Sequence, residues 1–168
     1  EPLLEIALIA DCCAVSKRIR EDVRFQLTTN GTLLTDAVVR RLLEWDIYTV
    51  VSLDGPSDNH DANRLFRKGS GSWKTVVGNL RRIRENHPEY YETHLGVNCV
   101  LAPNASPEAA AKFFSVENEL CPNGVMLVTL VSDRGTDYWT RNQPTVEWRN
   151  ELTELRSRYY EALITGEG

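Results

Sequence analysis

The sequence predicts an α/β fold in which helices cover a sheet of parallel strands. Strand-like runs alternate with helix-like segments, an order that is typical of parallel strands joined by helical crossovers. The strand-like runs are almost continuously apolar, as in sheets buried on both faces. The 168 residues, 42% hydrophobic and 26% charged, are enough for one domain with a core. A closed (β/α)8 barrel needs about 250 residues, so the strand–helix units form either an open sheet or part of a barrel.

The first half of the chain contains a helix followed by two strands. Pro2 suits the first turn of a helix over Leu3–Ile19. Its apolar residues occupy more than one stripe, which predicts a heavily covered helix. The strand Phe25–Thr29 ends in a polar turn, after which Thr35 can cap the next helix. The β-branched run Tyr48–Leu53 predicts the second strand.

The second half continues the same alternation. Ser72 can cap the helix that follows a long polar loop over Ser57–Gly71. Ser106-Pro107-Glu108 is a strong signal for the start of a later helix. The closing helix carries apolar residues at helical spacing from Trp148 to Leu163. The expected elements are helix Trp73–Asn86, strand Leu95–Leu101, strand Val125–Val131 and helix Thr145–Ile164.

Composition excludes several classes of protein. The net charge of −5 argues against a nucleic-acid partner. No apolar run reaches the length of about 18 residues that a membrane span needs, and the apolar start lacks the basic leader of a signal peptide. Cys12, Cys13, Cys99 and Cys121 show no zinc-binding spacing, and we expect Cys12 and Cys13 to be buried thiols. A reducing, cytoplasmic compartment therefore fits better than secretion.

Polar side chains collect where the expected strands end, which is where parallel α/β folds bind ligands. Any one of them is more often a turn or cap residue. Ser52 departs from that pattern, because it lies within an apolar strand where a buried hydroxyl needs a partner. Strand alternation puts Ser52 and Asp54 on the same side of the sheet. The full set is Asn30, Ser52, Asp54, Asn98, Asn104, Ser132 and Asp133.

The loop after the second strand is the other concentration of polar residues. Arg64 leaves the same sheet edge as Ser52, and its planar fork suits a ligand carboxylate. His60 is assigned no catalytic role. The segment Gly69–Gly71 lacks a phosphate-binding pattern and is expected to be a flexible hinge. His87 and His94 are expected at the surface.

Four strings stand in a fixed order over the stretch from Glu1 to about Asn104. They are Thr29-Asn30-Gly31-Thr32-Leu33-Leu34-Thr35, Val51-Ser52-Leu53-Asp54-Gly55-Pro56, His60-Asp61-x-x-Arg64 and Gly69-x-Gly71-Ser72-Trp73. Together they resemble motifs of the radical S-adenosylmethionine (radical SAM) enzymes. The subgroup that they resemble comprises anaerobic sulfatase maturases and peptide-modifying maturases with a C-terminal SPASM extension. From Cys121 onward the resemblance is only topological.

The resemblance implies a partial TIM-type barrel, namely strands three to six of a radical SAM (β/α)6 barrel, as a single domain over residues 1–168. It implies S-adenosylmethionine as a cofactor and a [4Fe–4S] cluster in the full-length parent. The C-x-x-x-C-x-x-C ligands of that cluster are absent from this sequence. The parent is then an oxidoreductase that modifies a peptide or protein side chain through a 5′-deoxyadenosyl radical.

The resemblance also implies roles for matching residues. Glu1 would hold the amino group of S-adenosylmethionine, and Ser52 would bond its ribose or methionyl part. Arg64 would pair with the methionyl carboxylate. Asn30 would line the pocket, and Val131 would border the adenine. No residue is assigned as catalytic or as a metal ligand.

Both ends of the chain look like cuts. Glu1-Pro2 resembles the second half of the family's Gly-Gly-Glu-Pro motif, and the chain closes on Gly166-Glu167-Gly168 without a SPASM segment. We therefore expect the chain by itself to be inactive as a radical enzyme. We also expect self-association through the exposed sheet edge at Phe25–Thr29.

Two other readings remain open from the sequence. One is a non-catalytic half-barrel that binds a partner. The other is a barrel hydrolase that uses Asp54 and Asp133 as a pair of carboxylates.

Overall fold

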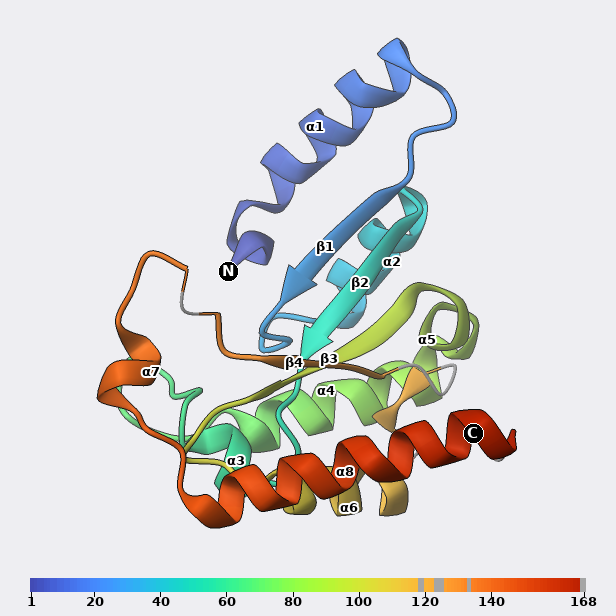
Figure 1. Ribbon diagram of the computed structural model, residues 1–168. Coiled ribbons are helices and arrows are strands. Elements are labelled where there is room, and N and C mark those ends of the chain that lie inside the picture. Colours follow the sequence, from blue (N-terminus) through green and yellow to red (C-terminus); the bar gives the residue numbers. More distant parts are fainter. Residues whose placement is uncertain (118–119, 123–125, 133, 167–168) are drawn as a thin grey trace.

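Four parallel strands form one sheet in sequence order, as predicted (Figure 1). The computed structural model describes residues 1–117, 120–122, 126–132 and 134–166. Strand β1 pairs with β2, β2 with β3 and β3 with β4. The bounds are β1 Phe25–Thr29, β2 Ile47–Ser52, β3 Leu95–Leu101 and β4 Met126–Leu130.

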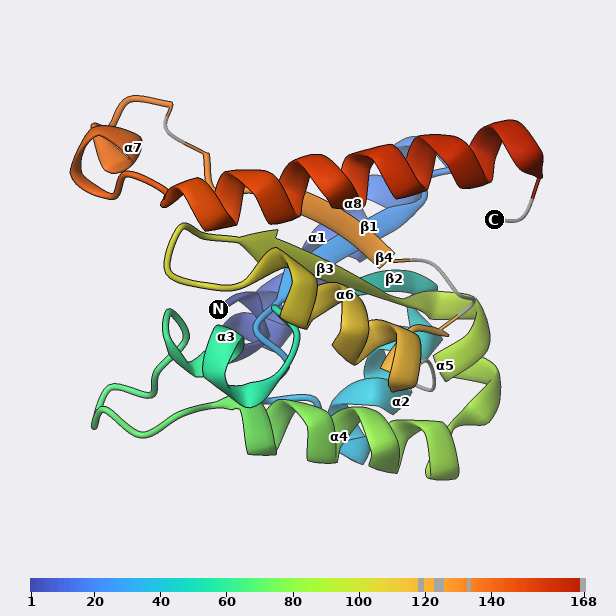
Figure 2. The ribbon, with the colours of Figure 1, turned by 60° about the horizontal axis from the view of Figure 1, so that its bottom comes forward.

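Helices connect the strands and lie along one side of the sheet. Figures 1 and 2 show α4, α6 and α8 gathered around β3 and β4, whereas α1 lies apart beside β1. The bounds are η1 Pro2–Glu5, α1 Ile6–Ile19, α2 Asp36–Glu44, α3 Ser57–Asp61, α4 Trp73–Asn86, α5 Pro88–His94, α6 Pro107–Val116, α7 Tyr138–Arg141 and α8 Val146–Thr165.

The two faces of the sheet are buried to different degrees. On β2, the side chains of Ile47, Thr49 and Val51 are buried, and Thr49 Oγ1 lies 2.7 Å from the hydroxyl of Tyr90 in α5. The alternate residues Tyr48 and Val50 are only half-buried. One face is therefore covered by helices, and the other is the more open inner face that a partial barrel presents.

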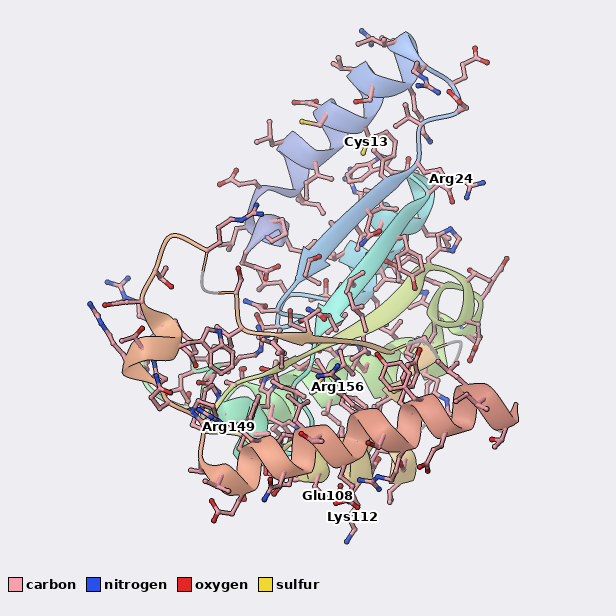
Figure 3. All side chains as sticks on the ribbon, viewed as in Figure 1. Cys13, Arg24, Glu108, Lys112, Arg149 and Arg156 are labelled. Carbon is pink, nitrogen blue, oxygen red and sulfur yellow. The ribbon has the colours of Figure 1, made fainter. Side chains whose placement is uncertain are left out.

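The expectation that the first helix is heavily covered is wrong. In α1 the side chain of Leu8 is 58% exposed and that of Ile19 is 78% exposed. Cys13 is buried on the side of the helix that faces β1 (Figure 3), whereas Cys12 is exposed, against the expectation for it. The helix lies beyond the edge strand, so its second apolar stripe meets no partner among the described residues.

The loop expected over Ser57–Gly71 is more structured than predicted. Its first part forms α3, and its second part is a short hairpin closed by an antiparallel bridge between Leu65 and Gly71. Gly69 turns this hairpin with a φ of +86°, which glycine adopts without strain. The segment is thus a hydrogen-bonded turn rather than a hinge. Ser72 does not cap α4, because its hydroxyl bonds elsewhere.

The closing part of the chain also differs in detail. Helix α8 buries Trp148, but Tyr159 and Leu163 at its far end are exposed. The sequence did not predict α5, which begins at Pro88. His94, which ends α5, is half-buried rather than at the surface and bonds Asp46.

Candidate functional site

A buried ion pair joins the end of β2 to the loop after α3. Asp54 Oδ2 accepts a hydrogen bond from Arg64 Nε at 2.6 Å, and Asp54 Oδ1 accepts one from Arg64 Nη2 at 3.1 Å. Asp54 Oδ1 also accepts from the backbone N–H of Val100 in β3, at 2.9 Å. The Asp54 side chain is 4% exposed and that of Arg64 is 26% exposed. This two-point contact fixes the plane of the guanidinium.

A histidine ties the same loop to the same strand end. His60 Nδ1 accepts a hydrogen bond from the backbone N–H of Asp54 at 3.3 Å. His60 Nε2 lies 3.0 Å from Ser72 Oγ, which in turn donates to the carbonyl oxygen of Arg64 at 2.8 Å. Burial lowers the pKa of the His60 imidazole, which favours the neutral ring. Sequence reasoning missed this function, because a loop histidine gives no signal of what it contacts.

The two loop motifs fold onto each other at several points. Asp61 Oδ1 accepts from the backbone N–H of Trp73 at 2.9 Å, and Trp73 Nε1 donates to the carbonyl oxygen of Gly55. A Cβ added at Gly71 would lie 2.0 Å from the Asp61 carboxylate, so a larger residue would push that carboxylate away from its place beside Trp73. The motif residues therefore act as one interlocked unit behind Arg64.

A cavity of about 340 Å³ lies in front of this unit at the carboxyl ends of the strands. It brings together two of the predicted site residues, Arg64 and Val131, with Asp54. The carbonyl oxygen of Val131 accepts a hydrogen bond from Trp139 Nε1 at 3.0 Å. The remaining lining residues are Asn63, Val100, Ala102 and Tyr138.

Ser52 lies in a polar layer on the inner face of the sheet. It is in register with Asn98 of β3, whose side chain accepts a hydrogen bond from Thr129 of β4. Ser52 is 6% exposed. Its hydroxyl is one donor and one acceptor group at the carboxyl end of β2, where parallel sheets bind ligands.

Glu1 and Asn30 meet at the end of β1, away from the lining of that cavity. Glu1 accepts hydrogen bonds from Thr29 Oγ1 at 2.5 Å, from the backbone N–H of Asn30 at 2.8 Å and from that of Leu3. Asn30 Oδ1 accepts from the backbone N–H and hydroxyl of Thr32. In this structure Asn30 has the turn role that its residue type favours, and its expected place in a ligand pocket stays a prediction.

Of the carboxylate pair weighed for a hydrolase, Asp133 lies outside the described residues. Asp54 accepts two hydrogen bonds from Arg64 and one from Val100, which leaves it poorly suited to proton transfer.

The cysteines do not fit a [4Fe–4S] cluster. Cys12 and Cys13 are on α1, whereas Cys99 is on the helix-covered face of β3. Burial raises the pKa of the Cys99 thiol to about 12, which disfavours the thiolate that iron needs. Among the described residues, no three His, Cys, Asp or Glu side chains gather as metal ligands.

A second cavity, of about 650 Å³, lies between β4, α6 and α8. Leu127, Leu130 and Leu152 contribute to its apolar lining, and Arg156 of α8 borders it (Figure 3). It lacks the convergent polar groups that mark a ligand site, so the smaller cavity beside Arg64 is the better candidate.

A sequence profile described as the Radical SAM superfamily matches residues 1–114. The chain belongs to the radical SAM superfamily. The match spans all four motif strings, so the resemblance predicted from them is confirmed at the level of the family. A search of curated proteins found no match.

Solved structures of the anaerobic sulfatase maturase anSMEcpe are similar to this radical SAM chain. Native anSMEcpe with bound AdoMet superposes with a TM-score of 0.72 at 17% identity, covering 98% of this chain and 45% of that chain. Native anSMEcpe with bound AdoMet and the Kp18Cys peptide gives a TM-score of 0.70 at 17% identity, with the same coverage. These likenesses confirm the partial TIM-type barrel. The chain thus spans less than half the length of the structures that it matches.

One negative finding bears on membranes. No helix in the described ranges is long and apolar enough to cross one.

Proposed function

We propose that the carboxyl-end site of this chain supplies part of the S-adenosylmethionine pocket of a radical SAM enzyme that modifies a peptide or protein side chain. The observation that carries the proposal is the ion pair of Asp54 with Arg64 at the wall of a cavity, in a chain of this family. The polar carboxyl ends of parallel strands are the general place for such a ligand.

Arg64 is suited to hold the methionyl carboxylate. A guanidinium has five N–H donors, and Asp54 takes one from Nε and one from Nη2. The rest are left for a ligand, in a plane that Asp54 has already fixed. A ligand carboxylate would then bind without the entropy cost of ordering a free arginine.

We assign Glu1, Ser52 and Val131 to other parts of the same ligand. A carboxylate has about four lone-pair sites, and Glu1 uses three in the hydrogen bonds described, so one remains for the ligand's ammonium. The Ser52 hydroxyl is available for the ribose or the methionyl chain. Val131 borders the cavity where the adenine is expected.

S-adenosylmethionine supplies, when bound and reduced, a 5′-deoxyadenosyl radical that abstracts a substrate hydrogen. The residues of this chain bind and orient it. They do not supply cluster ligands, so we propose that the [4Fe–4S] cluster of the parent is held by residues outside this chain. The chain alone is then inactive as a radical enzyme.

The proposal is tested by titrating the chain with S-adenosylmethionine in a calorimeter. We expect saturable binding that Arg64→Gln weakens by about tenfold or more, because a charge-assisted contact is lost. Arg20→Gln is the matched control, since Arg20 makes the same two-point contact with Asp22 but at the exposed surface. Binding that is equally unaffected by both substitutions would contradict the proposal.

A competition with free methionine and with adenosine separates the two ends of the ligand. Arg64→Gln should weaken methionine and leave adenosine unchanged. The opposite result would place Arg64 at the wrong end of the pocket.

A further inference from the structure

Besides the backbone hydrogen bonds of its hairpin, the loop that carries Arg64 is linked to the end of β2 by one imidazole and one hydroxyl. His60 is buried, with no measurable exposure, although it lies in the five-residue helix α3. Ser72 is 6% exposed and stands at the start of α4. The two residues face each other across the hairpin that follows Arg64.

The hydrogen bonds around His60 have only one consistent direction. The backbone N–H of Asp54 can only donate, so His60 Nδ1 must carry a lone pair. The ring proton is then on Nε2 and is donated to Ser72 Oγ. Ser72 spends its single proton on the carbonyl oxygen of Arg64. The relay thus runs from Asp54 N–H through His60 and Ser72 to the backbone of Arg64.

This relay and the ion pair close one ring. Asp54 begins the relay with its backbone and meets the Arg64 guanidinium with its carboxylate. Arg64 ends the relay with its carbonyl oxygen. Asp54, just after the end of β2, therefore holds Arg64 in two ways: its carboxylate bonds the guanidinium, and its backbone N–H begins the chain of hydrogen bonds that ends at the Arg64 carbonyl oxygen. Asp61, the other charged group beside His60 on α3, bonds the backbone of Trp73 instead.

We propose that His60 is a positioning residue that sets the place of the Arg64 guanidinium by acting through Ser72. The inference rests on the proposed function for its consequence in ligand binding, but the relay itself exists without a ligand. His60 does not itself line the cavity; it contacts the lining residue Asp54 only at the backbone N–H, and we infer that its effect on a ligand passes through Ser72 to Arg64.

Two substitutions divide the relay. In His60→Asn the side-chain oxygen can still accept from Asp54 N–H, but no donor reaches Ser72. In His60→Gln the side-chain nitrogen can take the place of Nε2 and donate to Ser72. His60→Ala removes both halves, and Ser72→Ala removes the second half without touching the imidazole.

The first measurement is the hydrogen exchange of the Arg64 Nε–H, followed by NMR. We expect His60→Ala, His60→Asn and Ser72→Ala each to speed this exchange by about tenfold, the scale of one lost buried hydrogen bond. His60→Gln should stay within about twofold of the original chain, and combining His60→Ala with Ser72→Ala should add nothing further. His94→Gln is the matched control, because His94 bonds Asp46 far from Arg64. If His60→Ala does not fold, the exchange rate of the Arg64 Nε–H in Ser72→Ala tests the proposal in its place.

Two results would overturn the proposal. One is an imidazole spectrum in which the proton of His60 is on Nδ1. The other is unchanged Arg64 exchange in Ser72→Ala and in any His60 variant that folds.

The second measurement is the affinity for S-adenosylmethionine. We expect His60→Ala to weaken it by about tenfold, and to have no effect when Arg64→Gln is already present. If the losses of affinity from His60→Ala and Arg64→Gln add up in the variant that carries both, His60 does not act through Arg64. Absence of any S-adenosylmethionine binding by the original chain would defeat the proposed function, whereas the exchange measurement would still decide the relay.

Discussion

Replacing Asp54 with Ala removes the acceptor of two hydrogen bonds from the Arg64 guanidinium and one from the backbone N–H of Val100. The guanidinium would remain at a site where its side chain is 26% exposed, without its counter-charge. The backbone N–H of Val100 would lose its partner as well. The substitution therefore tests how much of the fold near the site depends on this one carboxylate.

The magnitude follows from burial. Breaking a buried ion pair by removing one partner costs about 3–5 kcal/mol. Partial solvent access to Arg64 reduces that cost, and we expect Asp54→Ala to lower the free energy of unfolding by about 2–3 kcal/mol. For a chain of this size each kcal/mol shifts Tm by about 2–4 °C, so Tm should fall by roughly 4–12 °C.

The assay is a double-mutant cycle in urea. Unfolding is followed by tryptophan fluorescence for the original chain, Asp54→Ala, Arg64→Ala and the double variant. We expect a coupling energy of about 2 kcal/mol between the two sites, because the pair shares one short, buried contact. The same cycle at Arg20 and Asp22 is the control, since that pair has the same geometry at the surface.

The reasoning is refuted if the two cycles give the same coupling energy. Both pairs make a two-point contact, but only the pair of Asp54 and Arg64 is buried and joins segments ten positions apart. A coupling at Asp54 and Arg64 that is no larger than at the surface would mean that the buried pair does not hold the site together.

Four further expectations concern other parts of the molecule. Gly71→Ala should lower the free energy of unfolding by about 1–2 kcal/mol in the same urea assay, because the new Cβ displaces the Asp61 carboxylate from its backbone partner. Iodoacetamide should modify Cys12 in the folded chain and Cys99 only after unfolding, read by mass spectrometry, since Cys12 is exposed and burial raises the pKa of Cys99 to about 12. Because burial lowers the pKa of His60 from 6.5, the unfolded chain binds the proton first; stability that is full above pH 6.5 should fall as the pH drops below that value, in urea melts across pH. Sedimentation should show self-association through the edge strand β1 that rises with concentration.

Each of these has a contrary outcome. Gly78→Ala is the control for Gly71, because nothing lies within 4 Å of its added Cβ; it should stabilise α4 by about 0.5–1 kcal/mol. Equal effects of the two glycine substitutions would exclude the Asp61 clash. His60→Gln should remove the loss of stability that begins just below pH 6.5, whereas His94→Gln should leave it. Early labelling of Cys99, or a monomer at all concentrations, would contradict the corresponding expectation.

Local sequence signals predicted the bounds of an element correctly where such signals mark both of its ends. The strand Leu95–Leu101 and the helix Trp73–Asn86 have the predicted bounds, because apolar periodicity and flanking turns mark both ends. The coverage of α1 was predicted wrongly. An apolar stripe shows which side chains a helix could bury. Whether they are buried depends on whether another element packs against that face of the helix. The hairpin at Gly69 was not predicted, because polar composition alone does not show that Leu65 pairs with Gly71.

The site was predicted in part. The motif strings placed Ser52 and Arg64 at one end of the sheet, and Arg64 does line the cavity with Val131. Asn30 bonds its own turn, and its place in the ligand pocket stays a prediction. The partner of Arg64 was not foreseen. Asp54 stands in the preceding motif string, ten positions before Arg64, and nothing in the spacing shows that the two side chains meet.

The sequence by itself determined the family, the order of the four strands with the longer helices between them, and several polar residues at the carboxyl ends of the strands. These follow from periodicity and from motif spacing along the chain. The tertiary structure decided the partners: Asp54 with Arg64, His60 with Ser72, and Glu1 with the end of β1. A hydrogen bond depends on a few tenths of an ångström between atoms whose residues are separated by ten or more positions here. Packing sets those distances, and no local pattern in the sequence encodes them.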